Sequence, residues 1–297
     1  MKIGVIGVGA MGTQIAINLA RNGNTVYTYD RNPARGADAD LKAQTTFCPD
    51  VASVVRAAEL TITMTTNDEA VLDVAHKIVA EPKRATTIFV DLSSTSLVAT
   101  RALDAMMRTA GIAFLDAAVY GAGVQGAKDG KSPIVISGPR ETYDKIASTI
   151  APLGTVDYVG ELGRAKIIKI LNNQLVGAFC VAAAEIITIG LAAGISMEKI
   201  VESLTAGSGT SYILERYYPS YIRTGSFGLG LIPITYMIKD IALACSLAQE
   251  VGAEATITEL CRQIYQAAEN SVGDLPFPEV YSFYHKLNIG RHEGVPA

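Results

Sequence analysis

Short apolar runs alternate with amphipathic stretches over the first half of the chain. The runs are rich in β-branched residues, and apolar positions recur every three or four residues in the stretches between them. This alternation predicts an α/β domain with a doubly wound parallel sheet. The predicted strands are 2–7, 25–29, 60–64, 87–91, 113–116 and 133–137, and the predicted helices are 11–22, 50–58, 68–80, 96–110 and 140–150.

The pattern changes near Gly160. From Arg164 to Ala193 the chain is apolar, rich in alanine and helical in its periodicity, and no strand pattern follows. We therefore predict an α/β domain over 1–162 and an all-α domain for substrate binding and oligomerisation over 163–297, joined by a long interdomain helix. The further helices predicted in the second domain are 196–206, 210–223, 233–252, 253–272 and 276–287.

Two apolar stretches could be mistaken for segments directed to a membrane. Residues 3–20 carry no charge, but glycines and polar side chains interrupt them, which is unlike a signal peptide. The stretch 170–197 contains three side-chain amides and Glu185, which are costly in lipid. A buried helix of a soluble protein fits this second stretch better. We therefore expect a cytoplasmic protein with no membrane partner.

Composition and charge narrow the classes of function. The 297 residues are 49% hydrophobic and only 18% charged, which excludes a mostly disordered chain and allows large cores. The net charge is -4 and there is no basic run, so nucleic acid is not expected as a partner. The four cysteines and three histidines are scattered. Neither a disulfide framework, nor a metal site, nor a histidine-based catalytic triad is predicted.

Residues 7–12 read Gly-Val-Gly-Ala-Met-Gly and lie between the first predicted strand and the first predicted helix. In a Rossmann-type unit the first glycine permits a tight turn, and the second lets the backbone approach a pyrophosphate. The third lets the helix pack closely on the strand, and amides of the helix N-terminus face the phosphates. A Rossmann-type dinucleotide-binding domain is therefore predicted. The expected cofactor contacts in this motif are Gly7, Gly9, Ala10, Met11 and Gly12.

Asp30 ends the second predicted strand, 18 residues beyond Gly12, the last glycine of the motif. Its carboxylate can accept hydrogen bonds from the ribose 2′-hydroxyl of NAD, whereas the 2′-phosphate of NADP would meet a like charge. Arg31 follows it and could hold a 2′-phosphate, or be a solvated surface charge. NAD is therefore the expected cofactor, with NADP possible, and both Asp30 and Arg31 are candidate contacts.

Lys169 and Asn173 lie four residues apart in the long predicted helix and therefore share one face. Apolar neighbours surround Lys169, and partial desolvation favours a lysine that exchanges protons near neutral pH as a general acid or base. Asn173 could orient a hydroxyl or carbonyl group beside it. A surface lysine next to a polar turn is the alternative interpretation.

Four motifs, in this order, resemble those of the β-hydroxyacid dehydrogenase family, which includes 3-hydroxyisobutyrate dehydrogenase and tartronate semialdehyde reductase. They are the glycine-rich opening 4–23, Asp91-Leu92-Ser93-Ser94, the G-x-x-G and K-x-x-N-N pattern from Gly160 to Asn173, and Lys239-Asp240. The resemblance covers nearly the whole chain and extends to the wider superfamily of 6-phosphogluconate dehydrogenase-like proteins.

The resemblance implies an NAD(P)-dependent oxidoreductase that interconverts a small β-hydroxyacid and its aldehyde or ketone. Lys169 would transfer the proton, Asn173 would orient the substrate, and Lys239 would approach the cofactor from the helical domain. We expect a small-molecule substrate as the partner and a homodimer or homotetramer as the assembly. The positions expected near the nicotinamide ribose, at the carboxyl ends of strands, are Thr65, Thr66 and Ser94.

The segment from Asp116 to Ala127 departs from the family's substrate loop, D-A-P-V-S-G-G-x-x-G-A, by one extra residue and by loss of the serine. Either Tyr120 or Gly121 takes the place of the serine, depending on where the insertion lies. Backbone amides of this loop could still bind a substrate carboxylate. Tyrosines between 212 and 236 could line a pocket for a larger substrate, or simply pack. The candidate substrate contacts are Tyr120, Gly121, Ala122, Gly123 and Asn173.

Three other functions are compatible with this architecture. An imine reductase shares it, but a lysine at position 169 favours alcohol chemistry. A 6-phosphogluconate dehydrogenase usually has His-Asn where this chain has Asn172-Asn173. A dinucleotide-binding protein without catalysis is compatible with the lost serine, whereas retention of Lys169 argues against it.

Overall fold

The computed structural model describes residues 1–121, 123–228 and 231–292, with side chains up to residue 288. The chain forms two compact units, Met1–Lys169 and Ile170–Ala297, and each is described by itself. The division falls inside the long helix α8 (Arg164–Ala192), whereas the boundary expected from the sequence falls just before that helix.

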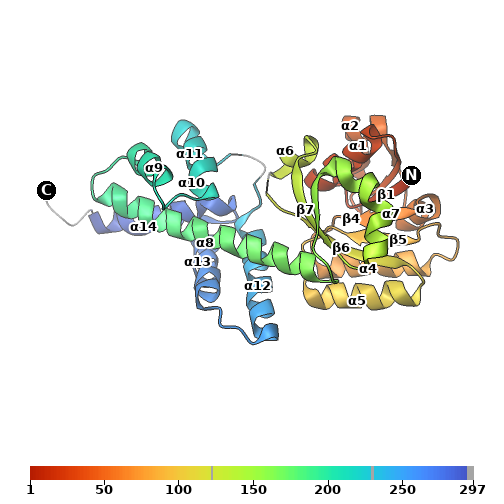
Figure 1. The fold of residues 1–297 in the computed structure, drawn as a ribbon. Helices are drawn as coiled ribbons and strands as arrows, with labels where there is room; N and C mark the ends of the chain where they lie inside the picture. The colour runs from red at the N-terminus through yellow and green to blue at the C-terminus, as the bar shows by residue number, and fades with distance from the viewer. Residues whose placement is uncertain (122, 229–230, 293–297) are drawn as a thin grey trace. The chain divides into compact units, whose positions relative to one another are not determined.

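Unit 1 is built around an eight-stranded sheet with the strand order β3-β2-β1-β4-β5-β6-β7-β8 (Figure 1). All neighbouring strands pair in parallel except β6 and β7, which are antiparallel. The strands are β1 (Lys2–Ile6), β2 (Thr25–Tyr29), β3 (Thr46–Phe47), β4 (Leu60–Thr63), β5 (Ile88–Asp91), β6 (Ala113–Val119), β7 (Ser132–Ser137) and β8 (Gly154–Tyr158).

The predicted doubly wound, Rossmann-type fold is confirmed; the sheet is mostly parallel, and β7 is the strand that departs from this direction. A parallel crossover needs a connection that carries a helix across the face of the sheet. Among its described residues, the segment between β6 and β7 has one helix, the six-residue α6 (Gly123–Lys128), which packs against α1 (Ala10–Arg21). The chain therefore turns back, and β7 runs antiparallel to β6. Strands β3 and β8 were not predicted.

Side chains alternate along β1 between two cores, one on each face of the sheet. Ile3 and Val5 pack with residues of α1 and α7, whereas Ile6 packs with residues of α3, α4 and α5. Helices therefore cover both faces, as a doubly wound sheet requires. The remaining helices of unit 1 are α2 (Ala39–Gln44), α3 (Val51–Ala57), α4 (Asp68–Ala80), α5 (Leu97–Thr109) and α7 (Arg140–Ile150), with single turns at Pro33–Ala37 and Ala151–Leu153.

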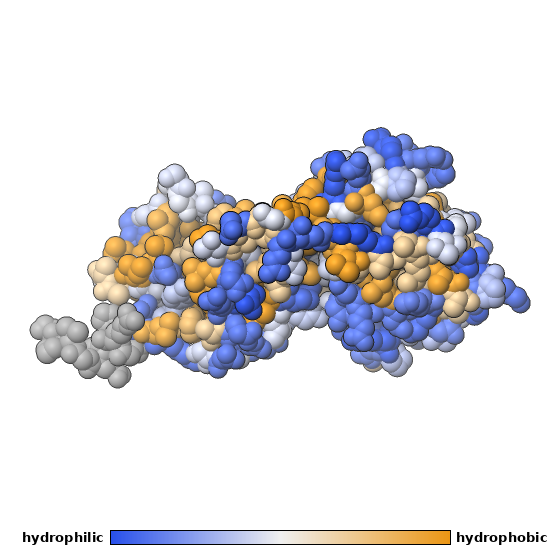
Figure 2. Space-filling view, turned by 90° about the horizontal axis from the view of Figure 1, so that it is seen from below, coloured by the Kyte–Doolittle hydropathy of each residue, from blue (hydrophilic) through white to orange (hydrophobic). Residues whose placement is uncertain are grey.

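The described part of unit 2 is helical. Its core contains the fully buried Tyr265 and Tyr218, around which the helices pack. Figure 2 shows apolar side chains gathered in patches on the surfaces of both units. The helices that follow α8 are α9 (Met197–Ala206), α10 (Tyr212–Arg216), α11 (Tyr218–Thr224), α12 (Ile234–Val251), α13 (Thr256–Val272) and α14 (Val280–His292), with a single turn at Phe277–Glu279.

Helix α8 is long and apolar enough to cross a membrane by length and composition, and it alone is so among the residues described. Of its most apolar window, 39% is buried within the protein. Core helices of soluble proteins pass the same test, so this helix is weak support for a membrane span. Its glycines allow close packing: a Cβ at Gly190 would lie 2.5 Å from the Cδ1 of Ile200 in α9.

Candidate active site

The glycine motif forms a tight turn between β1 and α1. Gly7 has a φ of +94°, and a Cβ there would lie 2.3 Å from the carbonyl oxygen of Met64. A Cβ at Gly12 would lie 1.9 Å from the carbonyl oxygen of Gly7. Glycine is therefore required at both positions. A Cβ at Gly9, in contrast, would meet no heavy atom within 4 Å.

The N-terminus of α1 fits the pyrophosphate of a dinucleotide. Gly9 is the N-cap, so no side chain caps the helix, and Ala10 is exposed and Met11 half-buried in its first turn. The first backbone N–H groups of a helix lack partners within the helix and favour an anion. The open space at Gly9 and these amides together can hold a dinucleotide.

Asp30, which follows β2, supports this turn through its carboxylate. Its Oδ2 accepts a hydrogen bond from the backbone N of Val8 at 2.9 Å, and its Oδ1 accepts one from the backbone N of Asn32 at 2.9 Å. The side chain is half-buried, whereas Arg31 is exposed. The carboxylate is therefore held in one orientation by the two segments that it joins.

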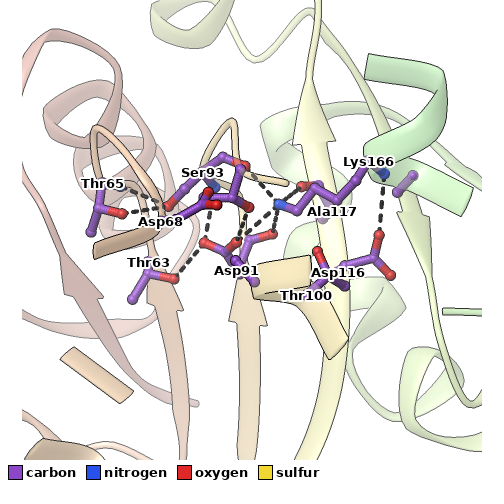
Figure 3. Close-up of polar contacts among 12 residues, drawn as sticks. Thr63, Thr65, Asp68, Asp91, Ser93, Thr100, Asp116, Ala117 and Lys166 are labelled. Atoms are coloured by element: carbon purple, nitrogen blue, oxygen red, sulfur yellow. Dashed lines mark hydrogen bonds and ion pairs between the residues drawn. The ribbon is translucent and has the colours of Figure 1, made fainter. Parts of the chain in front are cut away.

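The segments that follow β4 and β5 are joined by hydroxyl groups. The Oγ of Ser93 accepts a hydrogen bond from the backbone N of Thr65 at 2.8 Å and lies 2.9 Å from the Oγ1 of Thr65 (Figure 3). Ser94 is half-buried beside Ser93, and Thr66 is exposed beside Thr65. The structure thus brings the segments of the three expected ribose contacts to one end of two neighbouring strands.

A buried ion pair, which the sequence did not predict, lies behind these segments. The Nζ of Lys166 is 3.0 Å from the Oδ2 of Asp91, and their side chains are 1% and 0% exposed. The same Nζ donates to the carbonyl oxygens of Asp91 at 2.9 Å, Ser93 at 2.6 Å and Ala117 at 2.8 Å. Asp91 also accepts from the Oγ1 of Thr63 at 2.8 Å (Figure 3). Lys166 is thereby enclosed by oxygen atoms.

Asp116 caps the start of α8 from strand β6. Its Oδ1 accepts from the backbone N of Gly163 at 2.9 Å, and its Oδ2 from the backbone N of Lys166 at 3.2 Å. The Oγ of Ser137 donates to Asp116 at 2.5 Å and accepts from the backbone N of Ala165 at 3.0 Å. Burial raises the pKa of Asp116, although the charge of Lys166 and these hydrogen bonds oppose the shift. The first turn of α8 is thus fixed to the sheet.

The candidate substrate loop leaves β6 at Val119. Tyr120 is half-buried and packs against a small apolar cluster that includes Ala165 in the first turn of α8. Gly121 and Gly123 have φ angles of +67° and +57°, and Ala122 lies outside the described residues. These left-handed angles favour glycine at both positions.

The loop is also anchored through α6, which directly follows it. The Nδ2 of Asn18 in α1 donates to the carbonyl oxygen of Ala127 at 2.9 Å. The candidate loop is therefore tied to the same helix that starts at the glycine motif.

Lys169 is half-buried in α8, one turn beyond the fixed first turn, and is the last residue of unit 1. Asn173, one turn later on the same helix, belongs to unit 2. Its Nδ2 donates to the Oδ2 of Asp240 at 2.5 Å, and the Oδ1 of Asp240 is 2.9 Å from the Nζ of Lys239. Unit 2 thus brings Asn173 and Lys239 together on one buried carboxylate.

Three tyrosines singled out between 212 and 236 mainly pack. Tyr218 is 1% exposed and meets Phe227 edge-on at 5.3 Å between ring centroids, and burial raises its pKa far above the ordinary value. Tyr221 packs on the same phenylalanine at 4.6 Å, and Tyr217 meets Phe277 edge-on at 5.7 Å. Packing is therefore the better interpretation for these three rings.

The sequence indicates Lys166 only as the next candidate for proton transfer after Lys169, and it does not predict the buried ion pair that Lys166 forms with Asp91. It lies in the same apolar run as Lys169, three residues earlier, and the local pattern around the two lysines is alike. The distinguishing signal is the pair Asp91 and Asp116 at the ends of two predicted strands, which require a buried cation or donor. Among the residues described, no group of three or more His, Cys, Asp or Glu side chains could hold a metal ion.

Comparisons with known proteins give the following matches. A family model of the NAD binding domain of 6-phosphogluconate dehydrogenase matches residues 2–163. A second model, the NAD-binding region of NADP-dependent 3-hydroxyisobutyrate dehydrogenase, matches residues 163–281. The 2-(hydroxymethyl)glutarate dehydrogenase of Eubacterium barkeri is 31% identical over 270 residues, which cover 90% of this chain and 88% of that protein.

Two solved structures share the arrangement. A 3-hydroxyisobutyrate dehydrogenase of Mycobacterium tuberculosis, solved with L-serine, has a TM-score of 0.85 at 24% identity, covering 95% of this chain and 98% of that one. Psf3, in complex with NADP+ and 2-OPP, has a TM-score of 0.82 at 27% identity, covering 95% of this chain and 99% of that one.

Proposed function

Because the chain belongs to the β-hydroxyacid dehydrogenase family and is an NAD(P)-dependent dehydrogenase, we propose that it interconverts a β-hydroxyacid and the corresponding aldehyde or ketone. Lys169 would transfer the proton. The observation that carries this assignment is the place of Lys169 on α8: it lies one turn beyond the first turn that Asp116 fixes to the sheet. A general acid or base needs a defined position within hydrogen-bond reach of the proton that it transfers.

Different groups of the chain have different roles in the proposed reaction. Bound NAD(P) supplies the hydride acceptor for oxidation and the hydride donor for reduction. Lys169 takes the proton of the substrate hydroxyl during oxidation and returns it to the oxygen during reduction. Asn173 orients the reacting oxygen, and Asp240 fixes the amide of Asn173 by accepting its hydrogen bond. The amides at the start of α1 hold the cofactor phosphates.

We propose NAD rather than NADP as the preferred cofactor. The carboxylate of Asp30 is held by two backbone N–H groups, so it cannot turn away from the adenosine ribose without losing them. Each oxygen keeps a lone pair for a ribose hydroxyl, whereas a 2′-phosphate would meet its negative charge. Arg31 is exposed, which favours the interpretation of a surface charge.

The substrate is proposed to be bulkier or less dependent on its carboxylate than 3-hydroxyisobutyrate or L-serine. The loop lacks the serine that would donate a hydrogen bond at Tyr120 or Gly121, and Tyr120 itself adds an aromatic surface beside the start of α8. Sites that lack a hydrogen-bonding group discriminate weakly for its partner. The backbone N of Gly123 already donates to the carbonyl oxygen of Gly121 at 2.7 Å, so we propose the amide of Gly121 as the donor to a carboxylate.

We further propose a homodimer or homotetramer of a cytoplasmic enzyme. One face of α8 carries a row of exposed large apolar side chains, which a second copy of the chain would cover. A membrane is a poorer cover, because polar amides and Glu185 lie within the same helix. The exposed row consists of Leu171, Leu175, Phe179, Ile186 and Ile189.

A turnover screen tests the function. The protein is incubated with NAD or NADP and with short, dicarboxylic and aromatic β-hydroxyacids, including 2-(hydroxymethyl)glutarate, and the nicotinamide absorbance is followed. Lys169→Ala should lower turnover by roughly 10²–10⁴ while cofactor affinity changes little. Lys145→Ala, at an exposed lysine of α7, serves as the control.

Other outcomes would overturn the proposal. Reduction of imines without turnover of any hydroxyacid would indicate an imine reductase. Cofactor binding without turnover of either class would indicate a non-catalytic dinucleotide-binding protein. Turnover of Lys169→Ala within a few-fold of the wild type would remove Lys169 from the mechanism.

A further inference from the structure

Lys166 is a buried cation that the proposed mechanism does not use. Its ammonium group has three N–H donors, and four oxygen atoms surround it: three carbonyl oxygens and one carboxylate oxygen of Asp91. Every donor of Lys166 is therefore engaged inside the protein. A group in this position cannot reach a substrate, but it can hold the backbone segments whose carbonyl groups it binds.

Each segment that Lys166 holds leads directly into a candidate site residue. The carbonyl of Ser93 precedes Ser94, which is expected near the nicotinamide ribose. The carbonyl of Ala117 lies three residues before Tyr120 in the candidate substrate loop. Lys166 itself lies three residues before Lys169 on α8. The ammonium thus joins the ends of β5 and β6 to the helix that carries the proposed proton-transfer residue (Figure 3).

Hydrogen bonds fix both the backbone N and the side-chain Nζ of Lys166, so the position of this residue is well defined. Its backbone N donates to Asp116, and its Nζ is bound by Asp91, which accepts from Thr63 and from the backbone N of Ser93 at 3.0 Å. Buried polar networks in which all members are satisfied specify one arrangement of the chain. The network leaves no freedom for the three segments to shift separately.

We propose that Lys166 is a positioning residue for hydride and proton transfer, a role that rests on the proposed dehydrogenase function. It sets the distances among Ser94, the loop at Tyr120 and the proton-transfer group of Lys169. Displacement of reacting groups by about 1 Å can lower a rate roughly 100-fold. The bonds of this ammonium go to β5, β6 and the segment after β5 rather than to the cofactor turn at residues 7–12, so the cofactor contacts proposed at that turn are separable from positioning.

The first test is Lys166→Met, which approximates the length of the side chain and removes its donors. The expected result is a kcat roughly 10- to 100-fold lower, with the Kd for NADH within about threefold of the wild type. Amide hydrogen exchange should become faster at 93–96 and 117–120. These amides are read by mass spectrometry without any need for turnover.

Two further variants separate positioning from stability. Lys166→Met combined with Asp91→Asn removes the unpaired buried charge, so thermal stability should recover while kcat stays low. Thr86→Ala is the matched control, because the buried hydroxyl of Thr86 binds Thr61 at 2.8 Å and the carbonyl of Ala58 at 2.8 Å, before β5 begins. It should lower stability and leave kcat within about twofold when the protein is folded.

The outcomes decide between the roles. A kcat within about threefold of the wild type in folded Lys166→Met, or recovery of kcat together with stability in the double variant, overturns the positioning role. An equal loss of kcat in Thr86→Ala does the same. If the single variant does not fold, the double variant supplies the test. If the wild type converts no hydroxyacid, the proposed function fails, and the exchange of 93–96 and 117–120 still decides whether Lys166 holds these segments.

Discussion

Replacing each of two glycines in the same motif by alanine should separate cofactor binding from folding. A Cβ at Gly12 would lie 1.9 Å from the carbonyl oxygen of Gly7, so backbone must move by about 1 Å or more to relieve the contact. Overpacking of this kind costs about 1–3 kcal/mol. For a domain of this size the cost corresponds to a thermal midpoint roughly 2–12 °C lower.

Gly9→Ala should have little effect on folding. Its φ is -68°, which alanine adopts readily, and its Cβ would meet nothing within 4 Å. Alanine is a poorer N-cap than glycine, but it also restricts the unfolded chain, and these opposing terms are each about 0.5–1 kcal/mol. The added methyl group would instead occupy the space where the pyrophosphate is expected. A loss of at least about 1.4 kcal/mol, or tenfold in Kd, should follow.

Thermal denaturation and titration with NADH fluorescence measure the two quantities on each variant. The reasoning requires opposite results: Gly12→Ala should lose stability, and Gly9→Ala should lose affinity with an unchanged midpoint. If Gly9→Ala binds NADH as tightly as the wild type, the pyrophosphate does not lie over this glycine. If Gly12→Ala has the same thermal midpoint as the wild type, the turn is more deformable than its geometry indicates.

Three further variants test individual contacts. Asp30→Ala should shift the ratio of kcat/KM from NAD toward NADP; a wild type that prefers NADP would refute the role of this charge. Gly121→Ser should lower the thermal midpoint, because a serine at a φ of +67° costs about 1–2 kcal/mol. Tyr120→Ser does not carry this backbone cost. If the extra residue of the loop follows position 120, Tyr120→Ser should raise activity on short hydroxyacids. Asp240→Ala should lower kcat/KM roughly tenfold by releasing the amide of Asn173, and an unchanged value would show that the hydrogen bond does not orient it.

Local signals are enough to predict most of the fold of unit 1. The strand before Gly7 has an apolar run, and the strand before Asp30 is rich in β-branched and aromatic residues. The glycine motif identifies the turn between β1 and α1 through steric demands that act within a few residues. Strand β8 was missed because it lies at an edge and alternates between half-buried and exposed residues, so its apolar signal is weak. The direction of β7 depends on where α6 packs, which no local pattern contains.

In the candidate site, too, local spacing predicts some residues, whereas others depend on partners that are distant in the sequence. Spacing along one helix is sufficient to place Lys169 and Asn173 on a common face. Spacing could not show that Lys166 is enclosed by oxygen atoms, because its partners come from Asp91 and Ala117, which lie 75 and 49 residues away in the sequence. Likewise, the packing of Tyr218 against Phe227 depends on tertiary neighbours rather than on the aromatic content of the segment.

The two edge strands of the sheet affect how copies of this protein can associate without aggregating. An exposed edge offers unpaired backbone groups to which another sheet can add, and this is a common route to aggregation. Here β3 is only two residues long, and β8 exposes Thr155 and Asp157 along its short length. Neither edge is suited to extend a sheet from one copy into the next. For the proposed homo-oligomer we therefore expect contacts through helical surfaces, with the hydrogen-bonded sheet confined to a single chain.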